Sequence, residues 1–247
     1  MNKGNFFKTL CLSAAMAFCG INANAQLEQS VFLNGNLPTA EFNDAVSVTP
    51  ANAVINGFTP MNRIDAGTNA APGFGMGYRL NYSFDVGFGE VAPYLNADFQ
   101  WNQIKGKVRD EYTNARCRAP QYFNIPIMLG VQYRYTLTDI FKLFGELGLG
   151  YDVFMITSSG WKGDAPLPFY KYNVGGAMCW QIGAGSFFGS HVSAGLHYYG
   201  LGKHTIEFNK NAANTDIVDG NNNVIDDGTQ VVQRNLGSLM LRIGFHF

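Results

Sequence analysis

The chain has 247 residues, a formal net charge of −1 and only 14% charged residues. A near-neutral chain gives no electrostatic reason to expect nucleic-acid binding. Its mean hydropathy of −0.05 argues against a membrane protein built from helices, but not against one built from alternating strands.

The first segment has the pattern of a secretory signal peptide. Lys3 and Lys8 supply the positive start, residues 10–21 form an apolar stretch too short to span a membrane, and Ala23-Asn24-Ala25 forms an A-x-A cleavage site. We therefore expect residues 1–25 to be removed before Gln26, and residues 26–247 to form one domain.

The mature chain is dominated by alternation of period two, which is typical of β-strands. In PGFGMGYRLNYSF, residues 72–84, large apolar residues such as Phe74, Met76 and Leu80 alternate with Gly, Arg79, Asn and Ser. The same alternation predicts seven further strands, at 31–37, 93–102, 122–135, 143–155, 172–184, 191–201 and 236–247. The last of these ends on Phe245-His246-Phe247, an unusually bulky terminus.

The predicted connections alternate in length. Residues 85–89, 136–140 and 186–190 read as tight turns, and 38–72, 103–120, 156–171 and 202–235 read as long links that hold most of the Asn, Asp, Lys and Pro. In the first long link, Thr49-Pro50 followed by Gly57 could bracket one or two helical turns.

The composition of the two faces indicates which one is outward. Alternate residues of each strand form two faces. The polar face is rich in Gly, Ala and Ser with single charges, which suits a crowded interior. The other face is a continuous apolar surface with aromatic residues near the strand ends. A closed barrel also pairs every backbone group, as lipid requires. We therefore predict an eight-stranded antiparallel up-and-down transmembrane β-barrel, with short periplasmic turns and long extracellular loops.

Three stretches resemble the small outer-membrane β-barrel domain family of Gram-negative bacteria, the OmpA/OmpX-like and porin-like group. They are QYFNIPIMLGVQYRY (121–135), SAGLHYYGLGKH (193–204) and the closing LMLRIGFHF. The resemblance implies residence in the cell outer membrane and contact with its lipid and lipopolysaccharide. It also implies that Phe245 and Phe247 form a C-terminal signal read by the outer-membrane assembly machinery.

An eight-stranded barrel is just wide enough for side chains to fill it. The inward parity holds seven titratable residues, which must pair because buried unpaired charges are costly: Arg79, Asp98, Arg134, Glu146, Asp152, His197 and Arg242. We expect them to form a polar network that closes the lumen. The alternative is a narrow pore whose ion pairs rearrange.

Other polar motifs are weaker. His191-x-Ser193 could serve acyl transfer, but it follows a short turn, away from the outer leaflet, so no catalytic residues are assigned. Residues 216–228 resemble a calcium loop in spacing, yet Val224 and Gln230 stand where Gly and Glu are needed, so neither metal nor cofactor is assigned. Lys105, Lys107, Arg109, Arg116 and Arg118 could contact lipopolysaccharide phosphates or simply be solvated.

The function that these observations favour is a non-enzymatic barrel that acts in envelope structure or surface interaction through its loops, with an extracellular ligand as a possible partner. A narrow porin-like channel is the alternative. A lipid-modifying enzyme and a soluble lipocalin-like barrel fit the patterns less well.

Overall fold

The computed structural model describes residues 26–46, 65–114, 117–161, 169–211 and 229–247. The predicted signal peptide (1–25), the turns bracketed by Thr49-Pro50, Arg116 and the calcium-like segment 216–228 lie outside the described residues. Their assignments stay predictions. No helix in the described part of the chain is long and apolar enough to cross a membrane.

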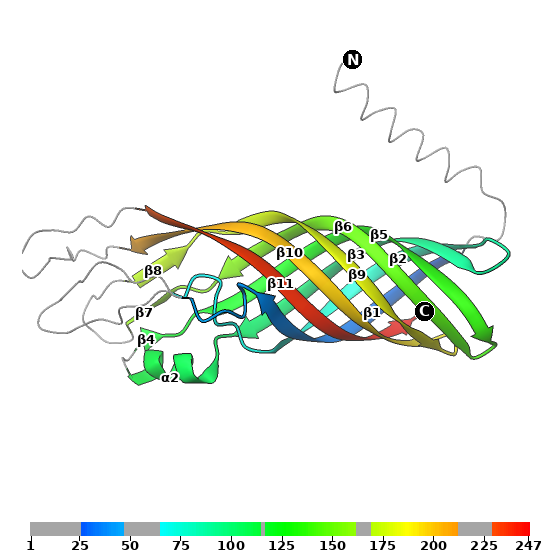
Figure 1. Ribbon diagram of the computed structural model, residues 1–247, viewed down its shortest axis with the longest axis horizontal. Helices are drawn as coiled ribbons and strands as arrows, with labels where there is room; N and C mark the ends of the chain where they lie inside the picture. Colours follow the sequence, from blue (N-terminus) through cyan, green and yellow to red (C-terminus); the bar gives the residue numbers. More distant parts are fainter. Residues whose placement is uncertain (1–25, 47–64, 115–116, 162–168, 212–228) are drawn as a thin grey trace, which may run out of the picture.

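Eight long antiparallel strands form a closed ring (Figure 1). Each pairs with its neighbours along the chain, and β11 pairs with both β10 and β1, which closes the ring. This confirms the predicted eight-stranded up-and-down barrel. The strands are β1 (Gln26–Ala40), β2 (Gly73–Asp85), β3 (Glu90–Gln103), β5 (Gln121–Thr138), β6 (Phe141–Ile156), β9 (Gly175–Phe188), β10 (Val192–Asn211) and β11 (Thr229–His246).

The short turns and the end of the chain lie together at one end of the barrel (Figure 1). Turns at 86–89, 139–140 and 189–191 connect β2 to β3, β5 to β6, and β9 to β10. Gly87 and Gly189 have positive φ angles of 87° and 66°, a conformation that a side chain would disfavour. The three tight turns are confirmed, and we call this end the short-turn end.

The long-loop end has more structure than the sequence predicted. It carries α2 (Gly106–Asn114) and the short strands β4 (Cys117–Arg118), β7 (Ser159–Trp161) and β8 (Phe169–Tyr172). The expectation that 202–235 is entirely a link was wrong, because β10 and β11 stay paired out to Asn209 and Thr229. After a bulge between Gly200 and Gly202, exposed residues such as Lys203 are polar while inward Ile206 is apolar, so the predicted apolar-out pattern reverses there.

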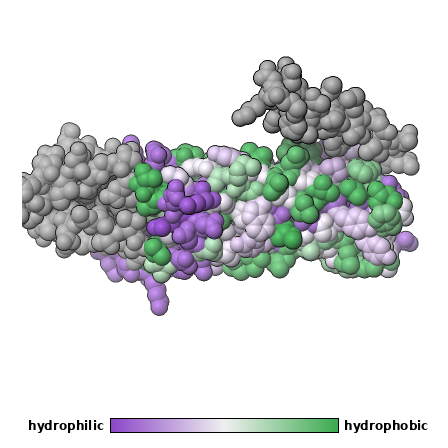
Figure 2. Space-filling view, turned by 45° about the horizontal axis from the view of Figure 1, so that its top comes forward, coloured by the Kyte–Doolittle hydropathy of each residue, from purple (hydrophilic) through white to green (hydrophobic). Residues whose placement is uncertain are grey.

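The outer surface of the barrel is apolar, as predicted. Leu129, Leu147 and Leu149 are each about two-thirds exposed, and Met178 is 71% exposed. Figure 2 shows hydrophobic side chains over much of the barrel and a hydrophilic patch towards the long-loop end. Aromatic pairs join neighbouring strands on this surface, among them Phe74–Trp101 with ring centroids 4.8 Å apart. A soluble barrel would bury these residues, so the surface indicates a lipid environment.

Candidate functional site

Glu146 of β6 is the hub of a polar network at the centre of the lumen. Arg79 of β2 donates two hydrogen bonds to its carboxylate, of 2.6 and 2.8 Å. The amides of Gln132 and Gln181 donate two more, of 2.8 and 3.1 Å, and His197 Nδ1 lies 3.1 Å from Oε1. Five strands therefore converge on one buried carboxylate, which gives it the dense hydrogen bonding that a buried charge needs.

A second ion pair lies beside the hub. Arg242 Nη2 of β11 lies 3.1 Å from Oδ2 of Asp98 on β3, and the Tyr199 hydroxyl donates to the same oxygen at 2.7 Å. The Arg242 guanidinium also lies over the Phe32 ring, 3.9 Å from its centroid, a favourable cation–π arrangement. We call these two ion pairs, with Gln132, Gln181, His197 and Tyr199, the central polar layer.

Arg134 organises a more open cluster at the short-turn end. It lies 2.7 Å from Glu28 and 3.6 Å from Glu90, and Lys142 lies 2.5 Å from the other oxygen of Glu90. The side chains of Glu28 and Glu90 are 22% and 24% exposed, whereas that of Glu146 is fully buried. Water therefore screens this cluster better than the central polar layer.

Residues 65–70 plug the lumen at the long-loop end. All six are buried, and the Tyr122 hydroxyl of β5 donates to the carbonyls of Asp65 and Thr68 at 2.9 and 2.7 Å. Phe42 packs edge-on against Tyr122 and Phe154, with centroids 5.5 and 6.0 Å apart. We call residues 65–70, with Phe42, Tyr122 and Phe154, the outer plug.

The helix α2 braces the outer plug from outside the barrel. Its Tyr112 hydroxyl donates to Asp65 Oδ2 at 3.0 Å, and Asn69 donates to the other Asp65 oxygen at 2.6 Å. Burial and the neighbouring Asp65 raise the pKa of Tyr112 above its ordinary range, so the phenol keeps its proton and remains a donor. Below the plug, His204 Nε2 lies 3.1 Å from Asp152 Oδ2.

The structure buries all seven titratable residues that the alternation placed inside the barrel. It brings Arg79, His197 and Arg242 within 4 Å of the Glu146 carboxylate, and Asp98 pairs with Arg242. Arg134 lies with the open cluster and Asp152 under the plug.

Sequence reasoning missed several partners of this network. Tyr94, which accepts a hydrogen bond from Gln181 and lies under the Arg79 guanidinium, and Tyr199 both point inward. The alternation placed them on the inward face but gave them no role. Glu28 lies in β1 but before the strand predicted at 31–37, and His204 lies beyond the predicted end of its strand at residue 201. Their positions could be found only from the strand register, which links residues more than 100 positions apart, as in Tyr199 and Asp98.

Ser193 hydrogen bonds to His246, not to His191 as the sequence motif suggested. His246 Nε2 lies 2.8 Å from Ser193 Oγ, whereas His191 Nδ1 lies 2.7 Å from Ser190 Oγ. Both pairs lie at the short-turn end. Among the described residues, no group of three or more His, Cys, Asp or Glu side chains is arranged to hold a metal ion.

Phe245 and Phe247 lie on the outer surface, 47% and 68% exposed. The backbone of Phe247 exchanges two hydrogen bonds with Gln29, of 3.0 and 3.1 Å, so the last residue is paired to β1. Their role as an assembly signal stays a prediction.

No protein-family model and no curated protein matches the chain. Three similar solved structures are outer membrane protein OprG of Pseudomonas aeruginosa, Neisserial surface protein A (NspA), and the attachment invasion locus protein Ail of Yersinia pestis. OprG is 13% identical over 92% of this chain and 98% of its own, with a TM-score of 0.43. NspA is 10% identical over 91% of this chain and 98% of its own, with a TM-score of 0.43. Ail is 15% identical over 89% of this chain and 98% of its own, with a TM-score of 0.35. The architecture agrees with the expected resemblance to small outer-membrane β-barrels.

Proposed function

We propose that the protein is a non-enzymatic integral barrel of the cell outer membrane with a closed lumen. Its role is in envelope structure or surface interaction, carried by the long-loop end. The observation that supports this most is the double closure of the lumen, by the central polar layer and by the outer plug. The apolar outer surface supports residence in lipid, with lipopolysaccharide as a neighbour of the outer half.

Closure at two levels favours this role over a narrow channel. Glu146 and Arg79 have side chains 0% and 6% exposed, and the pocket beside them has room for only about 20 Å³, as expected for an eight-stranded barrel whose side chains nearly fill it. An ion crossing there would have to separate a bidentate, buried ion pair, which is costly. The outer plug would then block it a second time.

The non-enzymatic part of the proposal rests on the surroundings of Ser193. The Ser193–His246 pair faces the lumen beside Arg79 and Arg242, and the adjoining space holds little more than a water molecule. A scissile acyl group has no room beside Ser193 Oγ.

Planar-bilayer recording of the refolded wild-type protein tests the proposal. We expect silence from protein whose folding is verified by heat-modifiable gel mobility. Discrete, reproducible openings at moderate voltage would reject it in favour of the channel.

A further inference from the structure

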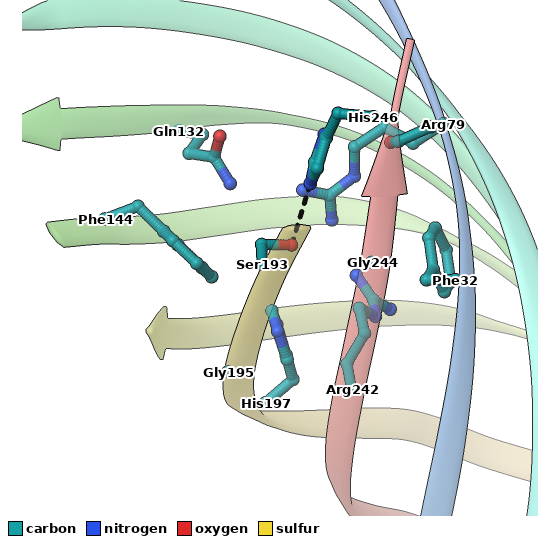
Figure 3. Close-up of a pocket in the computed structure, with 11 residues that line it drawn as sticks. Phe32, Arg79, Gln132, Phe144, Ser193, Gly195, His197, Arg242, Gly244 and His246 are labelled. Atoms are coloured by element: carbon teal, nitrogen blue, oxygen red, sulfur yellow. Dashed lines mark hydrogen bonds between the residues drawn. The ribbon is translucent and has the colours of Figure 1, made fainter. Parts of the chain in front are cut away.

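A small, partly enclosed space lies beside the central polar layer, towards the short-turn end. Its volume is about 20 Å³, and Arg79, Arg242, His197, Ser193 and His246 are among the eleven residues that line it (Figure 3). One buried water needs about 10–15 Å³ by the same kind of measure. The space therefore fits an atom-sized guest.

The lining presents donors and positive charge. None of the described residues that line the space is Asp or Glu. Glu146 and Asp98 contact the two guanidinium groups without lining the space themselves. Glu146 binds Nη1 and Nη2 of Arg79, and Asp98 binds Nη2 of Arg242. The remaining N–H groups, Arg79 Nε and Arg242 Nε and Nη1, are buried and have no hydrogen-bond partner among the described residues. Of these, Arg242 Nη1 lies 3.8 Å from Glu146 Oε1, beyond hydrogen-bond distance.

The Ser193 hydroxyl and the buried ring of His197 complete the lining. His197 is 1% exposed, and its Nε2 has no hydrogen-bond partner in the part of the chain that the structure describes. This nitrogen lies 3.0 Å from where a side chain on Gly195 would begin, so the absence of that side chain leaves room beside it. Figure 3 shows Ser193, His197, Arg242 and Arg79 arranged around the same space, with the Phe144 ring beside them. Aromatic ring edges carry partial positive charge, which also suits an anion.

We propose that this space is a binding site for a single monatomic anion, chloride or another halide. The anion accepts charge-assisted hydrogen bonds from the free N–H groups of Arg79 and Arg242, with the Ser193 hydroxyl as a further donor. A water molecule can accept only two hydrogen bonds and carries no charge, so it complements two guanidinium groups less well.

The site is reached from the short-turn end. A larger, open pocket of about 410 Å³ lies there, and His246 lines both this pocket and the enclosed space. The His246 ring, which forms a 2.8 Å hydrogen bond with Ser193, therefore borders both spaces. The proposal does not depend on whether the lumen conducts, so silent bilayer recordings leave it open to a separate test.

Anion-dependent stability and bromide diffraction test the proposal together. Folded protein in detergent is heated in sodium chloride, sodium bromide or sodium gluconate at equal ionic strength, and the loss of heat-modifiable mobility gives the midpoint. We expect each tenfold rise in halide above its Kd to raise the midpoint by on the order of 3–6 °C, with no such rise in gluconate. Crystals in bromide should show one anomalous peak between Arg79 and Arg242.

A matched pair of glycine variants controls the stability measurement. A Cβ on Gly244 would lie 2.6 Å from Ser193 Oγ and would occupy the site, whereas a Cβ on Gly145 has nothing within 4 Å. Gly244→Ala should abolish the halide effect and Gly145→Ala should keep it. Equal midpoints in halide and gluconate, or a halide effect unchanged in Gly244→Ala, would overturn the proposal. If Gly244→Ala does not fold, the wild-type bromide map decides, and a water molecule without anomalous signal there would overturn it.

Discussion

The central polar layer and the outer plug both close the lumen, but with opposite chemistry. The central layer uses buried ion pairs contributed by side chains of the barrel wall, such as Arg79–Glu146. The outer plug uses backbone from a connecting segment, packed against Phe42, Tyr122 and Phe154. Removing a charged side chain from the wall should therefore destabilise the barrel itself, whereas loosening the plug should leave the strands of the barrel in place.

The largest expected effect comes from breaking the central layer. Glu146→Ala leaves Arg79 buried without its carboxylate, and removing one partner of a buried pair costs about 3–5 kcal/mol. Urea unfolding in phospholipid vesicles should show this loss. A loss below about 1 kcal/mol would mean that water already screens the pair.

A charge on the outer surface should come next. Leu149 is 66% exposed in the middle of β6, and Leu149→Arg should cost about 2–4 kcal/mol if it faces the bilayer midplane. Leu137→Arg, beside the short turn, is the matched control and should cost about 0–1 kcal/mol. Equal costs at the two positions would contradict the lipid-facing assignment of this surface.

The outer plug should respond locally. Tyr122→Phe removes the hydroxyl that donates to Asp65 and Thr68, and leaving buried carbonyls unpaired costs about 1–3 kcal/mol. Because that cost falls on one segment, amide exchange of residues 65–70 should accelerate while exchange of the barrel strands stays slow. Acceleration throughout the barrel would show that the plug and the wall unfold as one unit.

The open cluster at the short-turn end should show the smallest effect. Glu90→Gln removes a partly exposed partner of Arg134 and Lys142, and such pairs contribute about 0–1 kcal/mol. The difference in free energy of unfolding between the variant and the wild type should shrink from low to high salt, because salt screens exposed ion pairs. A large, salt-independent loss would place this cluster with the central layer.

The sequence predicted the wall of the barrel better than its contents. Strands such as residues 72–84 could be located because their outward face contacts lipid and must be apolar, which imposes strict alternation. Beyond that apolar band the constraint ends, so the continuation of β10 past Gly202 and the helix α2 carried no comparable signal. The parity also separated inward from outward residues, including Arg79 and Glu146, but it could not pair them.

Pairing depends on the strand register, and the register depends on contacts far apart in the sequence. Arg242 meets Asp98 across 144 positions, and Tyr122 meets Asp65 across 57. Short-range patterns contain no information on such separations. The outer plug was missed for the same reason, since residues 65–70 have the composition of an ordinary loop.

Single-channel recording of variants that remove each closure, singly and together, tests the central claim most directly. The wild type, Glu146→Ala and Tyr122→Ala should each stay silent, because one intact closure suffices, and the double variant should show discrete openings once its folding is verified. Openings in the wild type or in either single variant, or silence in the folded double variant, would contradict closure by these two layers.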